Sequence, residues 1–227
     1  MYLYIMSSAT WDGFTYFTND PAFLINIGQG TSEPYGSRPN LDIVKQYVNA
    51  YPHRVRTMID VGAHIGTTAL PYSRIFQHVI GYEPTKENYN FCVQNIAHNG
   101  VTNVRVENCA ILDRHIQGTP TYHNTDNTGC IFFKEDTTGT ITTKILDEEG
   151  LSEVDFIKID TEGAEVFVLR SALQLITTWK PLIQVEQCGL SEKNFGVSAS
   201  SLLELLGSLG YRNLEGTDFF IHSEFPF

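Results

Sequence analysis

The glycine-rich segment at residues 60–66, Asp-Val-Gly-Ala-His-Ile-Gly, constrains the fold of this chain more than any other feature. It follows a short β-rich run at residues 57–61 and precedes a stretch with helical spacing of apolar residues at 67–76. A strand, a glycine turn and a helix in this order are typical of open parallel sheets, whose ligands bind beyond the carboxyl ends of the strands. The segment therefore predicts an α/β protein with a ligand site at this turn.

From residue 55 onward, β-rich runs alternate with segments of helical periodicity, which predicts a parallel sheet with helices on both faces. We expect strands at residues 57–61, 78–83, 103–108, 154–159, 182–186, 211–214 and 219–222, and helices at 41–48, 67–76, 86–98, 165–179 and 199–209. The last two strands are separated by a short turn and should form an antiparallel hairpin at the sheet edge. The predicted fold class is α/β, a Rossmann-like fold with a seven-stranded, mostly parallel sheet.

The chain length suits one domain of this kind with an additional segment before it. We expect residues 55–227 to form the Rossmann-like domain and residues 1–54 to be an N-terminal extension packed on its core. The extension is rich in aromatic residues, which should pack a β-hairpin over the sheet or line an acceptor site. These residues are Tyr2, Tyr4, Trp11, Phe14, Tyr16, Phe17 and Phe23. Residues 119–143, rich in threonine, glycine and asparagine, are either a hairpin insertion or a mobile loop.

Charge and hydropathy argue against several functional classes. The formal net charge of −11 at pH 7 disfavours a protein that neutralises nucleic acid phosphates or docks on an anionic membrane. The sequence has neither a membrane-spanning apolar run nor a secretory signal pattern. Its cysteines lack the spacing of a zinc site, which favours free thiols in a reducing compartment. We therefore expect a cytoplasmic protein without nucleic acid or membrane partners.

The acidic residue at the head of the loop narrows the choice of ligand. Dinucleotide-binding folds use a Gly-x-Gly pattern at this point, whereas this chain has Asp60 followed by Gly62. A pyrophosphate would face a carboxylate here, whereas the ammonium and sulfonium groups of S-adenosylmethionine would be attracted to it. The loop therefore favours S-adenosylmethionine as the cofactor.

Two further strand ends carry residues that suit this cofactor. Glu83 lies 23 positions after Asp60, at the end of the second strand, where a carboxylate can accept hydrogen bonds from ribose hydroxyls. Residues 108–110, at the end of the third strand, would border the adenine. The predicted cofactor contacts are Asp60, Gly62, Ala63, His64, Gly66, Glu83, Asn108, Cys109, Ala110 and Asp160. His64 could also accept a proton, but a loop histidine more often makes a positioning hydrogen bond.

Acidic residues gather at the ends of the fourth and fifth strands, where a methyl acceptor should lie. Asp160 and Glu162 follow the fourth strand, and Glu186 ends the fifth. One of these three could be the catalytic base that removes a proton from an acceptor hydroxyl, or Asp160 and Glu186 could hold a divalent metal ion. Alternatively, Asp160 could be a helix cap, and Glu162 and Glu165 could be acids of the first helical turn. The sequence leaves these alternatives open.

Taken together, these segments resemble the FkbM family of methyltransferases. The resemblance rests on residues 59–66, 82–84 and 181–186, and above all on the motif Lys-Ile-Asp-x-Glu-Gly-Ala-Glu at residues 158–165. It implies a class I methyltransferase fold and the S-adenosylmethionine-dependent O-methylation of a hydroxyl on a glycan or small-molecule acceptor. His64 and Thr161 depart from the asparagine and valine that are common at these positions of the family.

Other functions remain possible at this stage. A nicotinamide-dependent oxidoreductase is disfavoured by the missing Gly-x-Gly pattern. A cofactor-binding module without catalysis would fit the loop, although the acids at the fourth and fifth strand ends favour an enzyme. Nucleic acid methylation is disfavoured by the acidic composition. The sequence makes no prediction about the oligomeric state.

Overall fold

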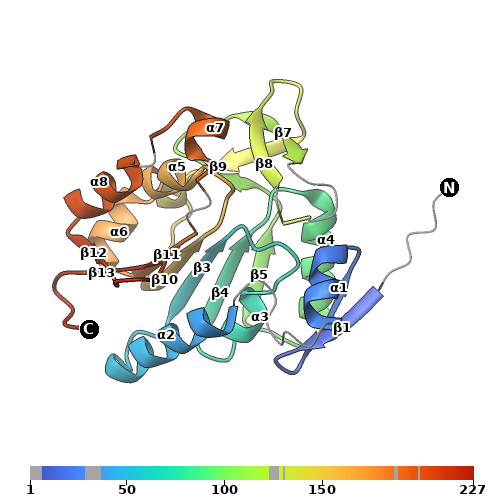
Figure 1. Ribbon diagram of the computed structural model, residues 1–227, viewed down its shortest axis with the longest axis horizontal. Coiled ribbons are helices and arrows are strands. Elements are labelled where there is room, and N and C mark those ends of the chain that lie inside the picture. Colours follow the sequence, from blue (N-terminus) through green and yellow to red (C-terminus); the bar gives the residue numbers. More distant parts are fainter. Residues whose placement is uncertain (1–6, 29–36, 123–127, 130, 187–188, 199) are drawn as a thin grey trace.

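A seven-stranded sheet forms the centre of the molecule in the computed structural model, which describes residues 7–28, 37–122, 128–129, 131–186, 189–198 and 200–227 (Figure 1). Its strands are β3 (Thr57–Val61), β4 (His78–Tyr82), β5 (Val104–Glu107), β10 (Val154–Ile159), β11 (Leu182–Val185), β12 (Tyr211–Asn213) and β13 (Phe219–His222). They lie side by side in the order β12-β13-β11-β10-β3-β4-β5.

The pairing of these strands confirms the predicted sheet. The strands β11, β10, β3, β4 and β5 pair in parallel, and the hairpin of β12 and β13 joins β11 in the antiparallel sense. The chain reverses its strand order at β3 and β10, and in such sheets ligands bind beyond the carboxyl ends at this switch point. The glycine loop follows β3 and the Asp160 turn follows β10, so both lie at this point.

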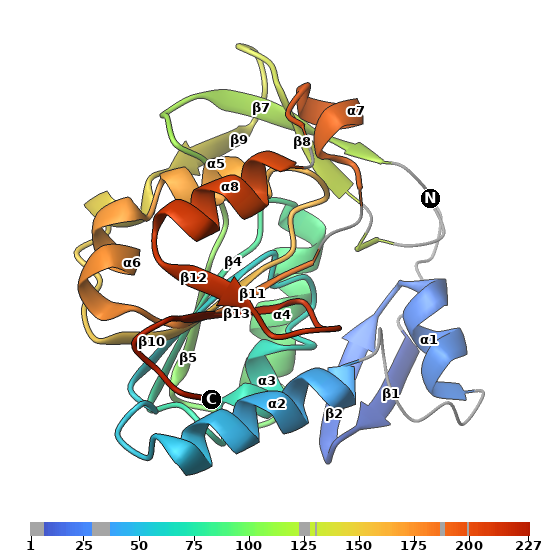
Figure 2. The same cartoon turned by 60° about the vertical axis from the view of Figure 1, so that its left-hand side comes forward.

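Helices cover both faces of the sheet (Figure 2). Successive strand residues point to opposite sides, and because those on both sides are apolar, each face must be covered. One face, with Ile59, Ile157 and Ile183, packs against α5 (Glu165–Arg170), α6 (Leu173–Trp179) and α8 (Ser200–Ser208). The other face, with Met58 and Phe156, packs against α2 (Ser37–Ala50) and α3 (Ala69–Tyr72). The helix α4 (Lys86–His98) packs on β5 and on the N-terminal strands.

Two predicted helices differ from the structure. The helix expected at residues 165–179 is broken into α5 and α6, because the carboxylate of Asp147 accepts hydrogen bonds from the backbone N–H groups of Gln174 and Leu175 and so starts a new helix there. The helix expected at 67–76 is limited to α3. Proline is tolerated only in the first turn of a helix, and Pro71 therefore prevents an earlier start.

The segment between the third and fourth predicted strands forms a second, smaller sheet. Its strands are β6 (Ala110–Ile111), β7 (Gln117–Tyr122), β8 (Ile131–Glu135) and β9 (Ile141–Lys144), in the order β6-β9-β7-β8. The strands β7 and β8 pair antiparallel, so the hairpin interpretation of this insertion is confirmed. Figure 1 shows this sheet at the end of the molecule toward which β3 and β4 point.

The N-terminal segment contains a β-hairpin of β1 (Ser7–Trp11) and β2 (Phe14–Thr18), followed by α1 (Pro21–Gly28). Asn95 of α4 and Asn99, which caps the end of that helix, accept hydrogen bonds from the backbone N–H groups of Phe17 and Thr15, respectively, and these bonds fix the hairpin on the helix. Trp11, Phe14, Tyr16 and Phe23 are buried against Ile65 and Leu70, so they pack a core and do not line a binding site. Tyr2 and Tyr4 lie outside the described residues.

Two further sequence expectations can be compared with the structure. Cys92 and Cys109 are buried free thiols, whereas Cys130 and Cys188 lie outside the described residues. Within the part of the chain that the structure describes, the helices are too short or too polar to cross a membrane.

Candidate functional site

The glycine loop makes a tight backbone turn against the end of β10. Gly62 has a φ of 86° and Gly66 a φ of 92°, values that only glycine adopts readily. A Cβ atom on Gly62 would lie 1.9 Å from the backbone oxygen of Asp160, and one on Gly66 would lie 3.2 Å from the Sγ of Cys92. Close packing therefore requires glycine at position 62, where the loop meets the Asp160 turn, whereas the positive φ favours glycine at position 66.

Glu83 fixes the loop from the neighbouring strand. Its Oε2 accepts a hydrogen bond from the backbone N–H of His64 (2.9 Å), and its Oε1 accepts bonds from the backbone N–H and the hydroxyl of Thr85. Burial raises the pKa of Glu83, and these hydrogen bonds oppose that shift. A carboxylate has about four acceptor positions. The Asn88 side chain is a further hydrogen-bond partner of this carboxylate, so a ribose hydroxyl would share a carboxylate oxygen with one of these protein donors.

His64 joins the loop to two distant segments. Its Nε2 lies 2.8 Å from the hydroxyl of Thr128 and 3.5 Å from Oδ2 of Asp20, and the Thr128 hydroxyl donates a hydrogen bond to the same Asp20 oxygen. Burial lowers the pKa of His64 to about 4, against the pull of the Asp20 carboxylate. The ring is therefore neutral at pH 7, and its contacts position the loop.

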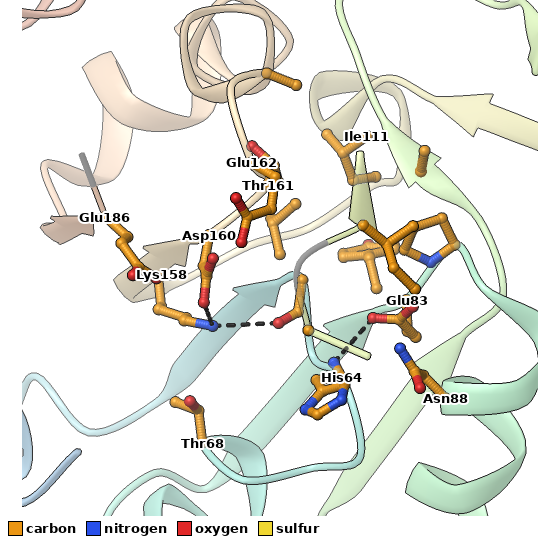
Figure 3. Close-up of a pocket in the computed structure, with 18 of the residues that line it drawn as sticks. His64, Thr68, Glu83, Asn88, Ile111, Lys158, Asp160, Thr161, Glu162 and Glu186 are labelled. Atoms are coloured by element: carbon orange, nitrogen blue, oxygen red, sulfur yellow. Dashed lines mark hydrogen bonds and ion pairs between the residues drawn. The ribbon is translucent and has the colours of Figure 1, made fainter. Parts of the chain in front are cut away.

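Lys158 lies at the centre of the site, and the sequence analysis did not select it. Its Nζ is 3.0 Å from Oδ2 of Asp160 and 3.5 Å from Oδ1 of Asp60, and it donates a 3.2 Å hydrogen bond to the backbone oxygen of Gly62 (Figure 3). Burial disfavours the ammonium ion, but the two carboxylates raise the pKa of Lys158 overall. A buried cation thus joins the glycine loop to both acidic strand ends.

Asp60 lies behind the loop and is fully buried. Neither of its carboxylate oxygens has a hydrogen-bond partner among the described residues, although Lys158 is its ion-pair partner. Burial raises the pKa of Asp60 to about 6, and Lys158 opposes this shift. Its position, adjacent to the site and short of hydrogen bonds, suits a positively charged ligand nearby.

Asp160 and Glu186 form a carboxylate pair whose members have opposite pKa shifts. Burial works against the charge of Asp160, but Lys158 and a hydrogen bond from Glu186 lower its pKa overall. The nearby charge of Asp160, together with burial, raises the pKa of Glu186. At pH 7 Asp160 is therefore the ionised member of the pair, and Glu186, whose pKa is raised to about 8, is mostly protonated.

A metal ion between Asp160 and Glu186 was one prediction for this pair. The described residues contain no group of three or more histidine, cysteine, aspartate or glutamate side chains arranged to hold a metal ion. The positive charge beside Asp160 is the ammonium of Lys158.

The turn after β10 separates the remaining acids by role. Glu162 has a φ of 56°, a strained value for a residue with a side chain, and strain of this kind is common at functional sites. Glu165 is buried, and its carboxylate accepts hydrogen bonds from the backbone N–H of Gly163 (2.7 Å) and from the hydroxyls of Thr161 and Ser191. Glu165 therefore stabilises the turn, whereas Glu162 lines a cavity at the carboxyl edge of the sheet.

One cavity of about 240 Å³ extends from Glu83 to Glu186 along the carboxyl edge of the sheet (Figure 3). The predicted site residues that line it are Gly62, His64, Glu83, Cys109, Ala110, Asp160, Glu162 and Glu186. Ala63, Gly66 and Asp60 are buried and are not among the residues that line the cavity. Asn108 donates hydrogen bonds to the backbone oxygens of Glu83 and Pro84, so it shapes this end of the cavity through the backbone.

Several lining residues were missed by sequence reasoning. They include Asn40, Thr68, Tyr72, Asn88, Thr128, Lys158, Gln184 and Asp218. A signal was present for Lys158 and Gln184, because each is a polar residue within a mostly apolar strand. Asn40, Thr128 and Asp218 come from segments that only the folded chain brings together.

The geometry agrees with the comparison to known families. The family described as the methyltransferase FkbM domain matches residues 60–213. This range includes the glycine loop and the cavity residues Glu83, Asp160, Glu162 and Glu186. This chain belongs to the FkbM methyltransferase family. The glycine loop and the motif at residues 158–165, on which the resemblance rests, both lie within the matched range.

Solved structures support the fold of this FkbM methyltransferase. A methyltransferase FkbM from Methylobacillus flagellatus is 19% identical and superposes with a TM-score of 0.50, over 74% of this chain and 44% of the other. A putative caffeoyl-CoA O-methyltransferase from Staphylococcus aureus is 15% identical, also with a TM-score of 0.50, over 87% and 88% of the two chains. The chain thus spans less than half of the first protein. A search among curated proteins gives no match.

Proposed function

We propose that this FkbM methyltransferase transfers the methyl group of S-adenosylmethionine to a hydroxyl of a glycan or small-molecule acceptor. The observation that carries the proposal is the single cavity that joins Glu83 to the carboxylate pair of Asp160 and Glu186. It offers a ribose anchor at one end and a proton acceptor at the other, which are the two features that such a transfer needs.

The chain's own residues suit the cofactor. Glu83 would accept hydrogen bonds from the ribose, and the backbone of Gly62 and His64 would lie against the ligand. Asp160 and, behind it, Asp60 would attract the positive charge of the methionine part. Cys109 and Ala110, both buried and lining the cavity, would border the adenine.

The cofactor, when bound, supplies an electrophilic methyl group on a sulfonium. The protein must hold the acceptor oxygen in line with that methyl group and receive the hydroxyl proton. Asp160 is held ionised by Lys158, whereas the raised pKa of Glu186 makes it the stronger base. We therefore assign the proton to a carboxylate oxygen of Glu186 and an orienting role to Asp160.

Calorimetry tests the cofactor part of the proposal. We expect S-adenosylhomocysteine to bind the wild-type protein and NAD not to bind. Glu83→Gln and Asp60→Asn should each weaken this binding by about tenfold or more, since each removes a charged partner worth about 1.5–3 kcal/mol. Glu87→Gln, which changes an acid at the start of α4 outside the cavity, is the matched control. Tight binding of NAD without S-adenosylhomocysteine would contradict the proposal.

A methyl-transfer assay tests the acceptor part. Radiolabelled S-adenosylmethionine would be incubated with the protein and a panel of hydroxylated glycosides, phenols and polyketide-like alcohols. We expect label to appear in at least one hydroxyl acceptor and to be lost in Glu186→Gln. Cofactor binding without transfer to any hydroxyl would instead favour a non-catalytic module or a different acceptor atom.

A further inference from the structure

Three polar side chains form a row across the buried middle of the sheet. Asp60 of β3, Lys158 of β10 and Gln184 of β11 are directly opposite one another in the strand register and so lie on the same face. Two positions earlier, the same face carries Met58 and Phe156, which are fully buried in an apolar core. The polar row therefore marks the place where the core under α2 and α3 ends and the cavity begins.

The third member of the row differs from the other two. Lys158 and Asp60 form an ion pair, whereas the side-chain amide of Gln184 has no hydrogen-bond partner among the described residues. Gln184 is only 7% exposed and lines the cavity. Neither amide atom of Gln184 is among the fully buried polar atoms that lack a partner, so the amide is open to the cavity. An amide that faces a cavity in this way is suited to a ligand that both donates and accepts hydrogen bonds.

The part of the cavity around Gln184, which we call the chamber, lies away from Glu83, because β10 and β3 separate β11 from β4 in the sheet. Asn40 of α2 and Tyr72 of α3 line it from the helical side, and Asp218, just before β13, lines it from the hairpin. The backbone oxygen of Asp218 accepts a 2.9 Å hydrogen bond from Val185, which fixes that residue beside the end of β11. The carboxylates of Asp160 and Glu186 lie at the same strand ends.

The charges of the chamber limit its ligand. Its cation, Lys158, is paired with the carboxylates of Asp60 and Asp160, and Asp218 adds a further acidic group. An anionic ligand would find acids there and no uncommitted positive charge, so it would be repelled. A neutral molecule with several hydroxyls would instead meet amides, a phenol and acceptor carboxylates.

We propose that this chamber, which is lined by Gln184, Asn40 and Tyr72, binds the methyl acceptor. It selects uncharged polyhydroxylated molecules over anionic ones. Gln184 is the recognition residue, because its amide is open to the cavity and can both donate and accept a hydrogen bond there. The inference rests on the proposed transfer to a hydroxyl, and it adds where the acceptor binds and which charge class is accepted.

The experiment uses NMR titration of the full chain saturated with S-adenosylhomocysteine. The probes are methyl glycosides of neutral hexoses and pentoses, and the methyl glycosides of the matching uronic acids. We expect at least one neutral glycoside to bind, and its uronic acid counterpart to bind more weakly. Gln184→Met, which keeps the length of the side chain and removes its hydrogen bonds, should weaken neutral glycoside binding by about 3- to 10-fold. Binding of S-adenosylhomocysteine should stay unchanged.

Asn40→Ala gives a second test at a half-buried position, should Gln184→Met fail to fold. It should weaken the neutral glycosides by a similar factor. Three results would overturn the inference: no neutral glycoside binds, the uronic acids bind as well as the neutral forms, or the variants leave glycoside affinity unchanged. Weaker S-adenosylhomocysteine binding in Gln184→Met would also overturn it, because the chamber would then hold the methionine tail of the cofactor. Failure of the wild-type protein to bind S-adenosylhomocysteine would instead contradict the proposed function.

Discussion

The ammonium nitrogen of Lys158 lies 3.0 Å from Oδ2 of Asp160, and both residues belong to one motif on a single strand end. The strand period of two places them on the same face, with Asp60 opposite Lys158 on the neighbouring strand. The motif therefore does more than supply an acid to the active site. It supplies the cation that keeps that acid ionised and that attaches the glycine loop to it.

Lys158→Met should destabilise the protein strongly. It would leave the buried Asp60 without its cation, and removal of one partner of a buried ion pair typically costs about 3–5 kcal/mol. We expect the free energy of unfolding, measured by urea denaturation, to fall by an amount in this range. Asp160 should lose its depressed pKa in the same variant, and cofactor affinity should fall with it.

Lys144→Met is the matched control for this change. Lys144 also contacts two carboxylates, those of Glu107 and Glu149, but its side chain is 37% exposed. Exposed ion pairs contribute about 0–1 kcal/mol, so the control should stay close to wild type. Equal losses of stability in the two variants would show that burial of Lys158 has no special role.

Gly62→Ala should be far more damaging than alanine at another glycine with a similar backbone. Both Gly62 and Gly150 have a positive φ, of 86° and 64°. A Cβ atom at Gly62 would lie 1.9 Å from the oxygen of Asp160, whereas one at Gly150 would meet nothing within 4 Å. We expect a loss of about 1 kcal/mol for Gly150→Ala from the backbone alone.

Thermal unfolding and calorimetry with S-adenosylhomocysteine would measure both glycine variants. Gly62→Ala should show a larger drop in Tm together with loss of cofactor binding, whereas Gly150→Ala should retain binding. If Gly62→Ala bound the cofactor normally, the contact of the loop with the Asp160 turn would not be required for the site.

Much of the fold could be predicted because its elements carry strong local signals. The bounds of α4 and β10 match the predicted ranges, since α4 ends at an Asn-Gly stop and β10 is an uninterrupted buried run. The break between α5 and α6 could not be predicted, because Asp147 starts the second helix from 27 residues away. Helical periodicity continues across such a break and does not reveal it.

Some site residues could be identified from local sequence patterns, whereas others depend on contacts between segments that are distant along the chain. Glu83 and Asp160 stand at strand ends beside recognisable turns, so spacing along the chain identified them. The partners of His64 could not be identified, because Thr128 is 64 residues away and lies in an irregular insertion. Gln184 stands out in the sequence as a polar residue within an apolar strand, but only the strand register shows that it lies in one row with Lys158.

The buried state of His64 predicts a pH dependence of stability. Burial lowers its pKa in the folded protein to about 4, below the unfolded value of about 6.5. The contribution is therefore fully present above pH 6.5 and is lost as the pH falls toward 4, since the unfolded chain then binds a proton that the folded chain excludes. Between pH 7 and pH 5 the loss should be about 2 kcal/mol.

Comparison of the wild type with His64→Asn isolates this contribution. Urea denaturation at pH 7 and pH 5 should show a smaller drop in the variant, because asparagine does not titrate. His115→Asn is a control of opposite sign, since hydrogen bonding to Glu148 raises the pKa of that exposed histidine. The same pH dependence in the wild type and His64→Asn would mean that His64 titrates as an exposed residue does.

The pH profile of methyl transfer should identify the base. The charge of Asp160 raises the pKa of Glu186, whereas Asp160 itself stays ionised down to low pH. If Glu186 takes the acceptor proton, kcat/KM should rise with pH through this raised pKa, because only the deprotonated carboxylate can act. Glu186→Gln should remove this rise and lower kcat by about 100-fold or more.

Glu192→Gln, an exposed acid on the neighbouring α7 (Ser191–Phe195), is the control and should keep the wild-type profile. A flat profile from pH 5 upward in the wild type, with activity lost only in Asp160→Asn, would assign the proton to Asp160 instead. The two assignments of the base can be distinguished because the pKa of Asp160 is lowered, whereas the pKa of Glu186 is raised. Lys158 enforces that separation by pairing with Asp160 at 3.0 Å.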